Sequence, residues 1–251
     1  MTNARNARTT REKAAELRAE AARQEARHRA VLIGVAIVTA VLVIVGAGVL
    51  IQTARQESID AANDTTPPAN LVDGAVVVGK ADAPVTITLY SDYICPYCGL
   101  AHHANKEQLD AWVAEGKVKL EYRLVAFLDQ ASTDNYSTRA LNMVAAVVNA
   151  KPEAFTVVND TLFSEQPEEG GAGLPDKHLV EIAVAAGAPE TEIRKAVENL
   201  TFRGWVMSTT EEASKAGVNA TPTLEVNGTA VKNAADAESV KAAVEKALGA
   251  G

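Results

Sequence analysis

The chain has 251 residues, a length that suits one large domain or two small ones. Hydrophobic residues make up 47% and charged residues 22%, which excludes a chain that is disordered throughout, and the formal net charge of −8 argues against nucleic-acid binding. Two cysteines are too few for a disulfide-rich scaffold or for a multi-cysteine zinc or iron–sulfur site.

Residues 30–51 form an uncharged run in which Thr39 is the one clearly polar side chain. A helix of this length spans about 33 Å, enough to cross a hydrocarbon core of about 30 Å. The run exceeds the roughly 7–15 apolar residues of a cleaved signal peptide, and no convincing small-x-small cleavage site follows it. The sequence therefore predicts one uncleaved transmembrane helix, in preference to a buried core helix or a signal peptide.

The charges on either side of this run predict its orientation. Residues 1–29 carry eight Arg and Lys against four Glu, a net charge of +4, so the rest of the chain carries −12. Because basic flanks stay on the cytoplasmic side, we expect a cytoplasmic tail at 1–29 and an extracytoplasmic domain on a single-pass cell-membrane anchor. The polar residues 52–73, with Pro67 and Pro68, are typical of a linker, which leaves a domain at 74–251.

The first part of this domain shows two strong strand patterns. The β-branched run at 85–90 predicts a buried strand, 118–125 a second one, and 75–78 a short edge strand. A helix is expected at 96–115, and strand, helix and strand in this order indicate a right-handed βαβ unit. The inner face of the helix at 96–115 is expected to consist of Leu100, Ala104, Leu109, Trp112 and Val113.

The middle of the domain is predicted to be a helical insertion of about 80 residues, interrupted by a surface loop at 166–173. The expected helices cover 136–149, 152–163, 176–186, 189–200 and 205–216. Strands at 223–227 and 229–232 follow, joined by an Asn227-Gly228 hairpin turn, and a helix at 237–248 closes the domain. The fold class is therefore α/β, with a βαβ unit and a ββα unit on either side of the insertion.

Both cysteines lie in the motif Cys95-Pro96-Tyr97-Cys98, between a predicted strand and a predicted helix. A disulfide that closes so short a loop stabilises little, so a redox pair is the better interpretation than a structural one. The unpaired N–H groups and the dipole of a helix N-terminus favour a Cys95 thiolate, and Pro96 suits the first helical position. Cys98, one turn further on, is expected to be the more buried cysteine, and a stabilised thiolate makes the disulfide form more oxidising.

With these residues the sequence resembles the DsbA-like branch of the thioredoxin superfamily over most of 74–250. The resemblance rests on SDYICPYC at 91–98, on the helical insertion and on GVNATPTLEVNG at 217–228. It implies a thioredoxin-like fold in which the proline at Pro222 is cis and packs beside the disulfide. It also implies that Thr221 offers backbone groups to an extended substrate.

The chain departs from the family pattern at two positions. Many members carry His where this chain has Tyr97, and that His helps to stabilise the thiolate. Thioredoxin-like proteins often bury an acid six residues before the first cysteine, where this chain has Leu89. A proton acceptor is then Asp92, Glu121 or water, or is absent, and a solvated or helix-N-terminal role is the simpler interpretation of each carboxylate.

His102 follows Cys98 by one helical turn and allows a different interpretation. Cys95, Cys98 and His102 together would supply three metal ligands, although exposed helical histidines are common and no acidic fourth ligand is evident nearby. The leading hypothesis needs no metal and no cofactor.

We expect an enzyme that forms disulfides in exported proteins by thiol–disulfide exchange at Cys95 and Cys98, supported by Pro96, Tyr97, Thr221 and Pro222. The resemblance alone implies reoxidation by a membrane partner of the DsbB or VKOR type. The alternatives are a disulfide reductase or isomerase, a metallochaperone, and a non-catalytic module that binds peptides.

Overall fold

The structure is a computed structural model, and it describes residues 66–249. The chain divides into two compact units, Met1–Glu57 and Ser58–Gly251, and the described residues belong to the second. The predicted tail at 1–29, the anchor at 30–51 and the first part of the linker lie outside the described residues. From residue 66 to residue 249, no helix has both the length and the apolar character that a membrane crossing requires.

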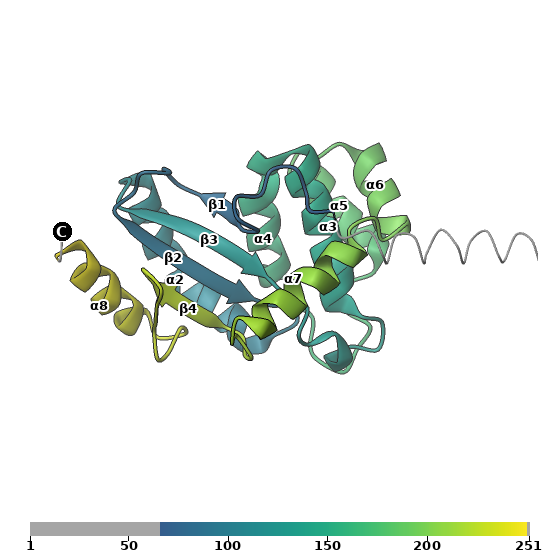
Figure 1. Ribbon diagram of the computed structural model, residues 1–251. Helices are drawn as coiled ribbons and strands as arrows, with labels where there is room; N and C mark the ends of the chain where they lie inside the picture. The colour runs from purple at the N-terminus through teal and green to yellow at the C-terminus, as the bar shows by residue number, and fades with distance from the viewer. Residues whose placement is uncertain (1–65, 250–251) are drawn as a thin grey trace, which may run out of the picture. The chain divides into compact units, whose positions relative to one another are not determined.

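Five strands form one mixed sheet in the order β1-β3-β2-β4-β5 (Figure 1). Their bounds are β1 (Val76–Val78), β2 (Val85–Ser91), β3 (Val118–Leu124), β4 (Thr223–Val226) and β5 (Thr229–Ala230). The neighbours β2 and β3 are parallel, whereas β1 on β3 and β4 on β2 are antiparallel. The parallel pair confirms the predicted βαβ unit, and β1 lies at a sheet edge as predicted.

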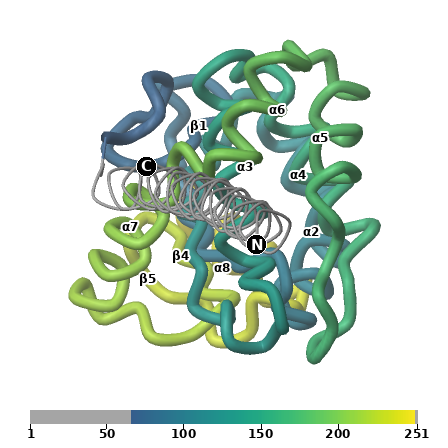
Figure 2. The backbone as a smooth tube through the Cα atoms, turned by 90° about the vertical axis from the view of Figure 1, so that its right-hand side faces the viewer, coloured from purple at the N-terminus to yellow at the C-terminus, as the bar shows by residue number. Residues whose placement is uncertain are grey.

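The helices lie in the predicted order, with boundaries that differ by up to about three residues. Their bounds are α2 (Pro96–Ala114), α3 (Tyr136–Ala150), α4 (Phe155–Ser164), α5 (Asp176–Ala185), α6 (Glu190–Glu198), α7 (Arg203–Lys215) and α8 (Ala237–Leu248), with short 3₁₀ turns η1 (Asp129–Ala131) and η2 (Pro152–Ala154). Figures 1 and 2 show α3, α4, α5 and α6 grouped together, at the end of the sheet toward which β2 and β3 run. The turn after β2 therefore lies between the sheet and the helical insertion.

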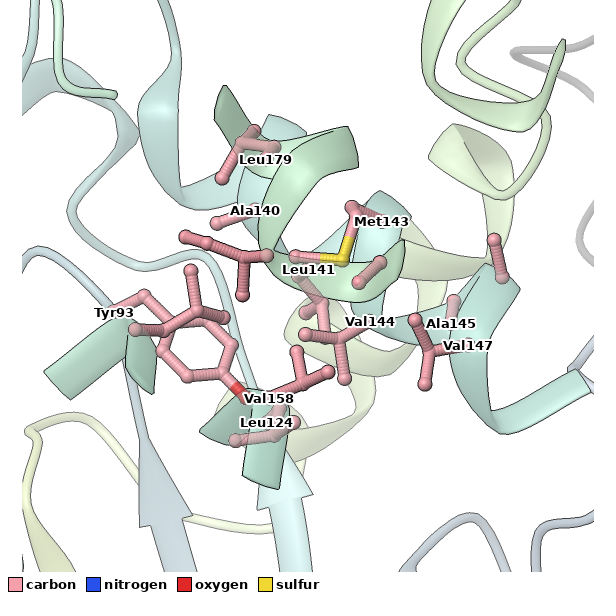
Figure 3. Packing of buried hydrophobic residues seen from close by; sticks show 14 of the residues in the cluster. Tyr93, Leu124, Ala140, Leu141, Met143, Val144, Ala145, Val147, Val158 and Leu179 are labelled. Atoms are coloured by element: carbon pink, nitrogen blue, oxygen red, sulfur yellow. The ribbon is translucent and has the colours of Figure 1, made fainter. Parts of the chain in front are cut away.

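A hydrophobic core joins this turn to the insertion. The helix α3 is buried from Tyr136 to Val148, so it forms the centre of the insertion rather than a surface element. Figure 3 shows Tyr93, from the turn after β2, packed with Leu141 of α3 and Val158 of α4. The Tyr93 hydroxyl is 3.0 Å from the side-chain oxygen of Asn159, which satisfies its polar end.

The predicted inner face of α2 is partly wrong. Leu109 and Trp112 are buried, but Ala104 is exposed and Leu100 is 57% exposed. The buried residues of α2 are Cys98, Gly99, Ala101, Asn105, Leu109 and Trp112. The prediction passed over Asn105 because it is polar, but its amide donates to the carbonyls of Ala101 and Ala234, at 2.7 and 2.8 Å, so its burial carries no unpaired donor.

Candidate active site

The redox motif forms the start of α2. Cys95 is the N-cap residue, with extended backbone angles, and Pro96 occupies the first turn. The Cys95 carbonyl accepts hydrogen bonds from the N–H groups of Cys98 and Gly99, at 3.0 and 3.2 Å. The missing N–H of Pro96 costs nothing at this position, because the first N–H groups of a helix have no partner within it.

The two thiols are free and both are buried: Cys95 is 3% exposed and Cys98 is 1% exposed. The Cys98 thiol donates a hydrogen bond to the Cys95 sulfur, and this bond is the main reason why the pKa of Cys95 falls to about 6. The Thr221 side chain and the N–H groups of Cys98 and Tyr97 lower it further, against the opposing effect of burial. Burial raises the pKa of Cys98, and the bond to Cys95 raises it again, so Cys95 is the thiolate of the pair.

The loop before β4 completes the pair's surroundings. The Thr221–Pro222 peptide bond is cis, which agrees with the expectation from the resemblance. The Cys95 sulfur lies 3.3 Å from the carbonyl oxygen of Thr221, across 126 residues of chain, and donates to this oxygen when it is protonated. Antiparallel pairing of β2 with β4 sets Tyr90 opposite Thr223, which brings this loop beside the start of α2. The structure thus gathers the six predicted site residues in one place.

Asp92 is a buried part of this site, with 0% exposure, so the expectation of a solvated or helix-N-terminal position is wrong for this residue. Its carboxylate accepts hydrogen bonds from the N–H of Ile94 at 3.1 Å, the hydroxyl of Ser137 at 2.6 Å and the N–H of Leu128 at 2.8 Å. Burial raises the pKa of Asp92, and these donors oppose that rise. The N–H of Asp92 lies 3.5 Å from the Cys98 sulfur, so the carboxylate anchors the backbone behind that thiol.

Glu121, the other carboxylate considered as a proton acceptor, lies on β3 and is partly exposed. It pairs with the surface cations Lys119 at 2.9 Å and Arg123 at 4.0 Å. These contacts agree with the solvated role expected for it.

Gln166 belongs to the site, although the sequence predicts a surface turn for its loop at 166–173. Its amide donates to the carbonyls of Tyr93 and Cys95, both at 2.9 Å. It also covers Gly99, where an added Cβ would lie 2.3 Å from the Gln166 side-chain oxygen. No local pattern reveals these contacts, because the partner carbonyls lie 73 and 71 residues away along the chain.

His102 lies on α2 behind the cysteine pair, and its side chain is 11% exposed. Its ring stacks on Phe163 with centroids 4.8 Å apart, and its Nε2 lies 3.2 Å from Asp160. Across residues 66–249, no three Cys, His, Asp or Glu side chains are grouped so as to hold a metal ion. The arrangement of His102 therefore gives no support to the metal-binding alternative.

Two apolar side chains stand in solvent beside the buried thiols. Tyr97 is 67% exposed and Leu100 is 57% exposed, both in the first turns of α2. Both side chains lie within five residues of Cys95 along the chain, so the surface beside the thiols is partly apolar.

Comparisons with known proteins agree with this geometry. A family model described as thioredoxin matches residues 72–246. Disulfide bond formation protein D of Bacillus subtilis strain 168 is 30% identical over 190 residues, which cover 74% of this chain and 82% of that protein. Oxidised BdbD from Bacillus subtilis has a TM-score of 0.64 at 26% identity, covering 74% of this chain and all of that chain. Reduced DsbA from Mycobacterium tuberculosis has a TM-score of 0.56 at 27% identity, and the match covers 69% of this chain and 99% of that chain.

Proposed function

Because the chain belongs to the thioredoxin family and is a DsbA-like thiol:disulfide oxidoreductase, we propose that it forms disulfide bonds in exported proteins. The observation that supports the oxidising direction is the position of Cys95 at the N-cap of α2, where the Cys98 thiol and the N–H groups of Tyr97 and Cys98 stabilise its thiolate and lower its pKa. A stabilised thiolate lowers the free energy of the dithiol form, so the disulfide form is the stronger oxidant.

The proposed reaction begins with a Cys95–Cys98 disulfide. A substrate thiolate attacks the Cys95 sulfur and the Cys95–Cys98 bond breaks. The Cys98 sulfur takes the electron pair of the broken bond and then a proton. A second substrate thiolate then attacks the substrate sulfur of the mixed disulfide, and Cys95 leaves as a thiolate. The substrate gains one disulfide and the enzyme becomes a dithiol, so two electrons pass to the enzyme.

The other four site residues have supporting roles in this proposal. Pro96 starts α2 at the position that places Cys95 on its N-cap, and Tyr97 offers an exposed apolar contact to the substrate. Thr221 and Pro222 border the thiols, where the backbone of Thr221 pairs with an extended substrate. These roles follow the family pattern and the contacts of the described residues.

The proposal includes a location and a partner. The apolar run at 30–51 and the basic tail before it support a single-pass anchor with the redox domain outside the cytoplasm. The dithiol form must return its two electrons to an acceptor, and a membrane partner of the DsbB or VKOR type is the acceptor proposed. A reporter attached after Gly251 should react with a membrane-impermeant label on intact cells; labelling only after lysis contradicts the orientation.

The deciding experiment is the reduction potential of the Cys95–Cys98 pair in the full chain, measured in glutathione buffers in detergent. A value of about −120 mV, that of DsbA, supports an oxidase, whereas about −270 mV, that of thioredoxin, indicates a reductase. The same preparation should oxidise a reduced, unfolded dithiol protein with a stoichiometry of one disulfide per enzyme. The Cys95→Ser variant, which lacks the attacked sulfur, is the control and should oxidise none.

A further inference from the structure

Each turnover requires Cys98 to gain or lose a proton in a buried place. Its thiol is 1% exposed and its pKa is raised, so it cannot exchange a proton directly with bulk water. Leu89 lines the space behind it and has no proton to exchange. The Asp92 carboxylate is engaged by Ile94, Leu128 and Ser137 and does not border that space. The proton must therefore travel by another route.

A small cavity of about 20 Å³ lies behind the cysteine pair and the cis-proline loop, between α2, α4 and the sheet. Cys98 lines one part of it, and His102 and Asp160 line another. Ser91 and Asn105 add polar groups to its wall. The volume accommodates one water molecule, and the wall offers it several hydrogen-bond partners.

His102 is the group on this wall that is suited to relay a proton, because a neutral imidazole carries an N–H donor on one ring nitrogen and a basic lone pair on the other. The titratable or charged groups that contact it or share the cavity wall with it are Cys98, His103, Lys106 and Asp110 on α2, Tyr122 on β3 and Asp160 on α4. Burial raises the pKa of Tyr122, so this tyrosine keeps its proton. Lys106 is held by Asp110 and Asp160 at 2.6 and 2.7 Å, as a cation.

Asp160 gives the imidazole its orientation. Burial raises the pKa of Asp160, but hydrogen bonds from His102 and Lys106 outweigh this and lower it, so the group is a carboxylate. His102 Nε2 lies 3.2 Å from it, which favours the tautomer with the proton on Nε2 and leaves Nδ1 as the basic nitrogen. The stacking of the ring on Phe163 holds it in this place.

We propose that His102, oriented by Asp160, exchanges the proton of the Cys98 thiol through one water molecule in this cavity. In the oxidising direction the substrate thiolate attacks Cys95, the Cys95–Cys98 bond breaks, and the Cys98 sulfur takes the electron pair. The water protonates this sulfur and receives a proton from the imidazolium. In the reverse step Cys98 loses its proton to the imidazole as it attacks the Cys95 sulfur of a mixed disulfide, and the substrate thiolate leaves.

This inference rests on the proposed function, and its test follows one chemical step. The full chain in detergent is converted to a mixed disulfide between Cys95 and 5-thio-2-nitrobenzoate, and the release of the coloured thiolate by Cys98 is followed in stopped flow from pH 5 to pH 9. His102→Gln keeps a donor for Asp160 but has no basic nitrogen. It should slow release at pH 7 at least tenfold and remove the inflection that proton exchange by His102 gives the wild-type pH profile.

Two further variants separate proton transfer from packing. His102→Ala should be equally slow, and millimolar imidazole should restore at least part of its rate, since the truncated side chain leaves room beside the cavity. His103→Ala, on the exposed neighbouring position, should retain the wild-type profile. If the His102→Gln variant releases the thiolate at the wild-type rate with the wild-type pH profile, His102 only packs and the inference is overturned.

The outcomes also distinguish this inference from the proposed function. Loss of the inflection in Asp92→Asn, with His102→Gln unchanged, would assign the proton to Asp92 and overturn the proposal. Rapid, His102-dependent release in a protein that fails to oxidise a reduced substrate protein would leave the proton route standing and contradict the oxidase role alone.

Discussion

Gln166 holds the backbone of Cys95 from a position 71 residues away along the chain, by a hydrogen bond of 2.9 Å from its amide to the Cys95 carbonyl. The same amide donates to the Tyr93 carbonyl. The helical insertion thus contacts the redox turn directly, and the stability of the insertion and the geometry of the site are coupled.

Gly99→Ala should destabilise the protein by displacing the Gln166 amide, since the new Cβ would lie 2.3 Å from its oxygen. Gln166→Ala should cost about 1–2 kcal/mol through its lost hydrogen bonds, and Gly99→Ala a similar amount. In the Gln166→Ala background, Gly99→Ala should be neutral or stabilise by about 0.5–1 kcal/mol, because Ala suits a helix better than Gly. Urea unfolding of the four proteins measures this cycle, and additive costs would show that the two residues act independently.

The reduced protein should alkylate at Cys95 with a pH midpoint near 6, because the thiolate is stabilised chiefly by the Cys98 thiol. Cys98→Ala removes this donor and should move the midpoint toward the ordinary cysteine value of about 8.5. Cys98→Ser retains a hydroxyl donor and should move it less. The rate of alkylation by iodoacetamide, measured against pH, gives the midpoint for the wild-type protein and for both variants. Equal midpoints in the Ala and Ser variants would count against a hydrogen bond from Cys98 to the Cys95 sulfur.

The same shift makes the stability of the reduced protein depend on pH. The folded pKa of Cys95 is lowered from 9.0 to about 6, so its contribution is fully present above pH 9 and is lost as pH falls to about 6. The reduced wild-type protein should therefore lose stability over this range relative to Cys95→Ala. Parallel curves of unfolding free energy against pH for the two proteins would contradict the shift.

Ser137→Ala should destabilise the fold by about 1.5–3 kcal/mol at pH 7, because it removes a hydrogen bond of 2.6 Å to the buried carboxylate of Asp92. The pKa of Asp92 is already raised in the folded protein, so ionisation of this carboxyl costs stability as pH rises through that pKa. The variant lacks one donor to the carboxylate and should raise the pKa of Asp92 further. The cost should consequently shrink as the pH falls and the Asp92 carboxyl takes up its proton. Ser164→Ala, at an exposed helix end, should show no such pH dependence.

Arg139→Lys should destabilise the insertion by about 2–3 kcal/mol, since one ammonium cannot replace a guanidinium that contacts four oxygens. The guanidinium donates to the carbonyls of Asp134, Ala172 and Leu174 and to the Asp176 carboxylate, at 2.7–2.9 Å. Arg194→Lys is the matched control, because its pair with Glu190 is exposed and should contribute nothing measurable. Thermal unfolding compares the two variants with the wild-type protein. Equal midpoints for all three would show that contacts other than those of Arg139 hold the loop before α5.

Sequence reasoning worked where the physical cause is local. The Cys95 N-cap and Pro96 depend on neighbouring residues, and the strand and helix patterns depend on residues a few positions apart. The likeness to known proteins in SDYICPYC and GVNATPTLEVNG also lies in short segments. From these alone, the fold class, the order of elements and the redox pair could be predicted.

What only the tertiary structure decided is which polar groups are buried and what satisfies them. Polarity suggested exposure for Asp92 and kept Asn105 off the predicted inner face of α2. The Leu128 N–H and the Ser137 hydroxyl donate to Asp92, and the Ala234 carbonyl accepts from Asn105, so both side chains are stable when buried. The contacts of Cys95 with Thr221 and with Gln166 and the pairing of His102 with Asp160 also join distant segments. Such partners are set by the packing of whole elements, so no local pattern in the sequence encodes them.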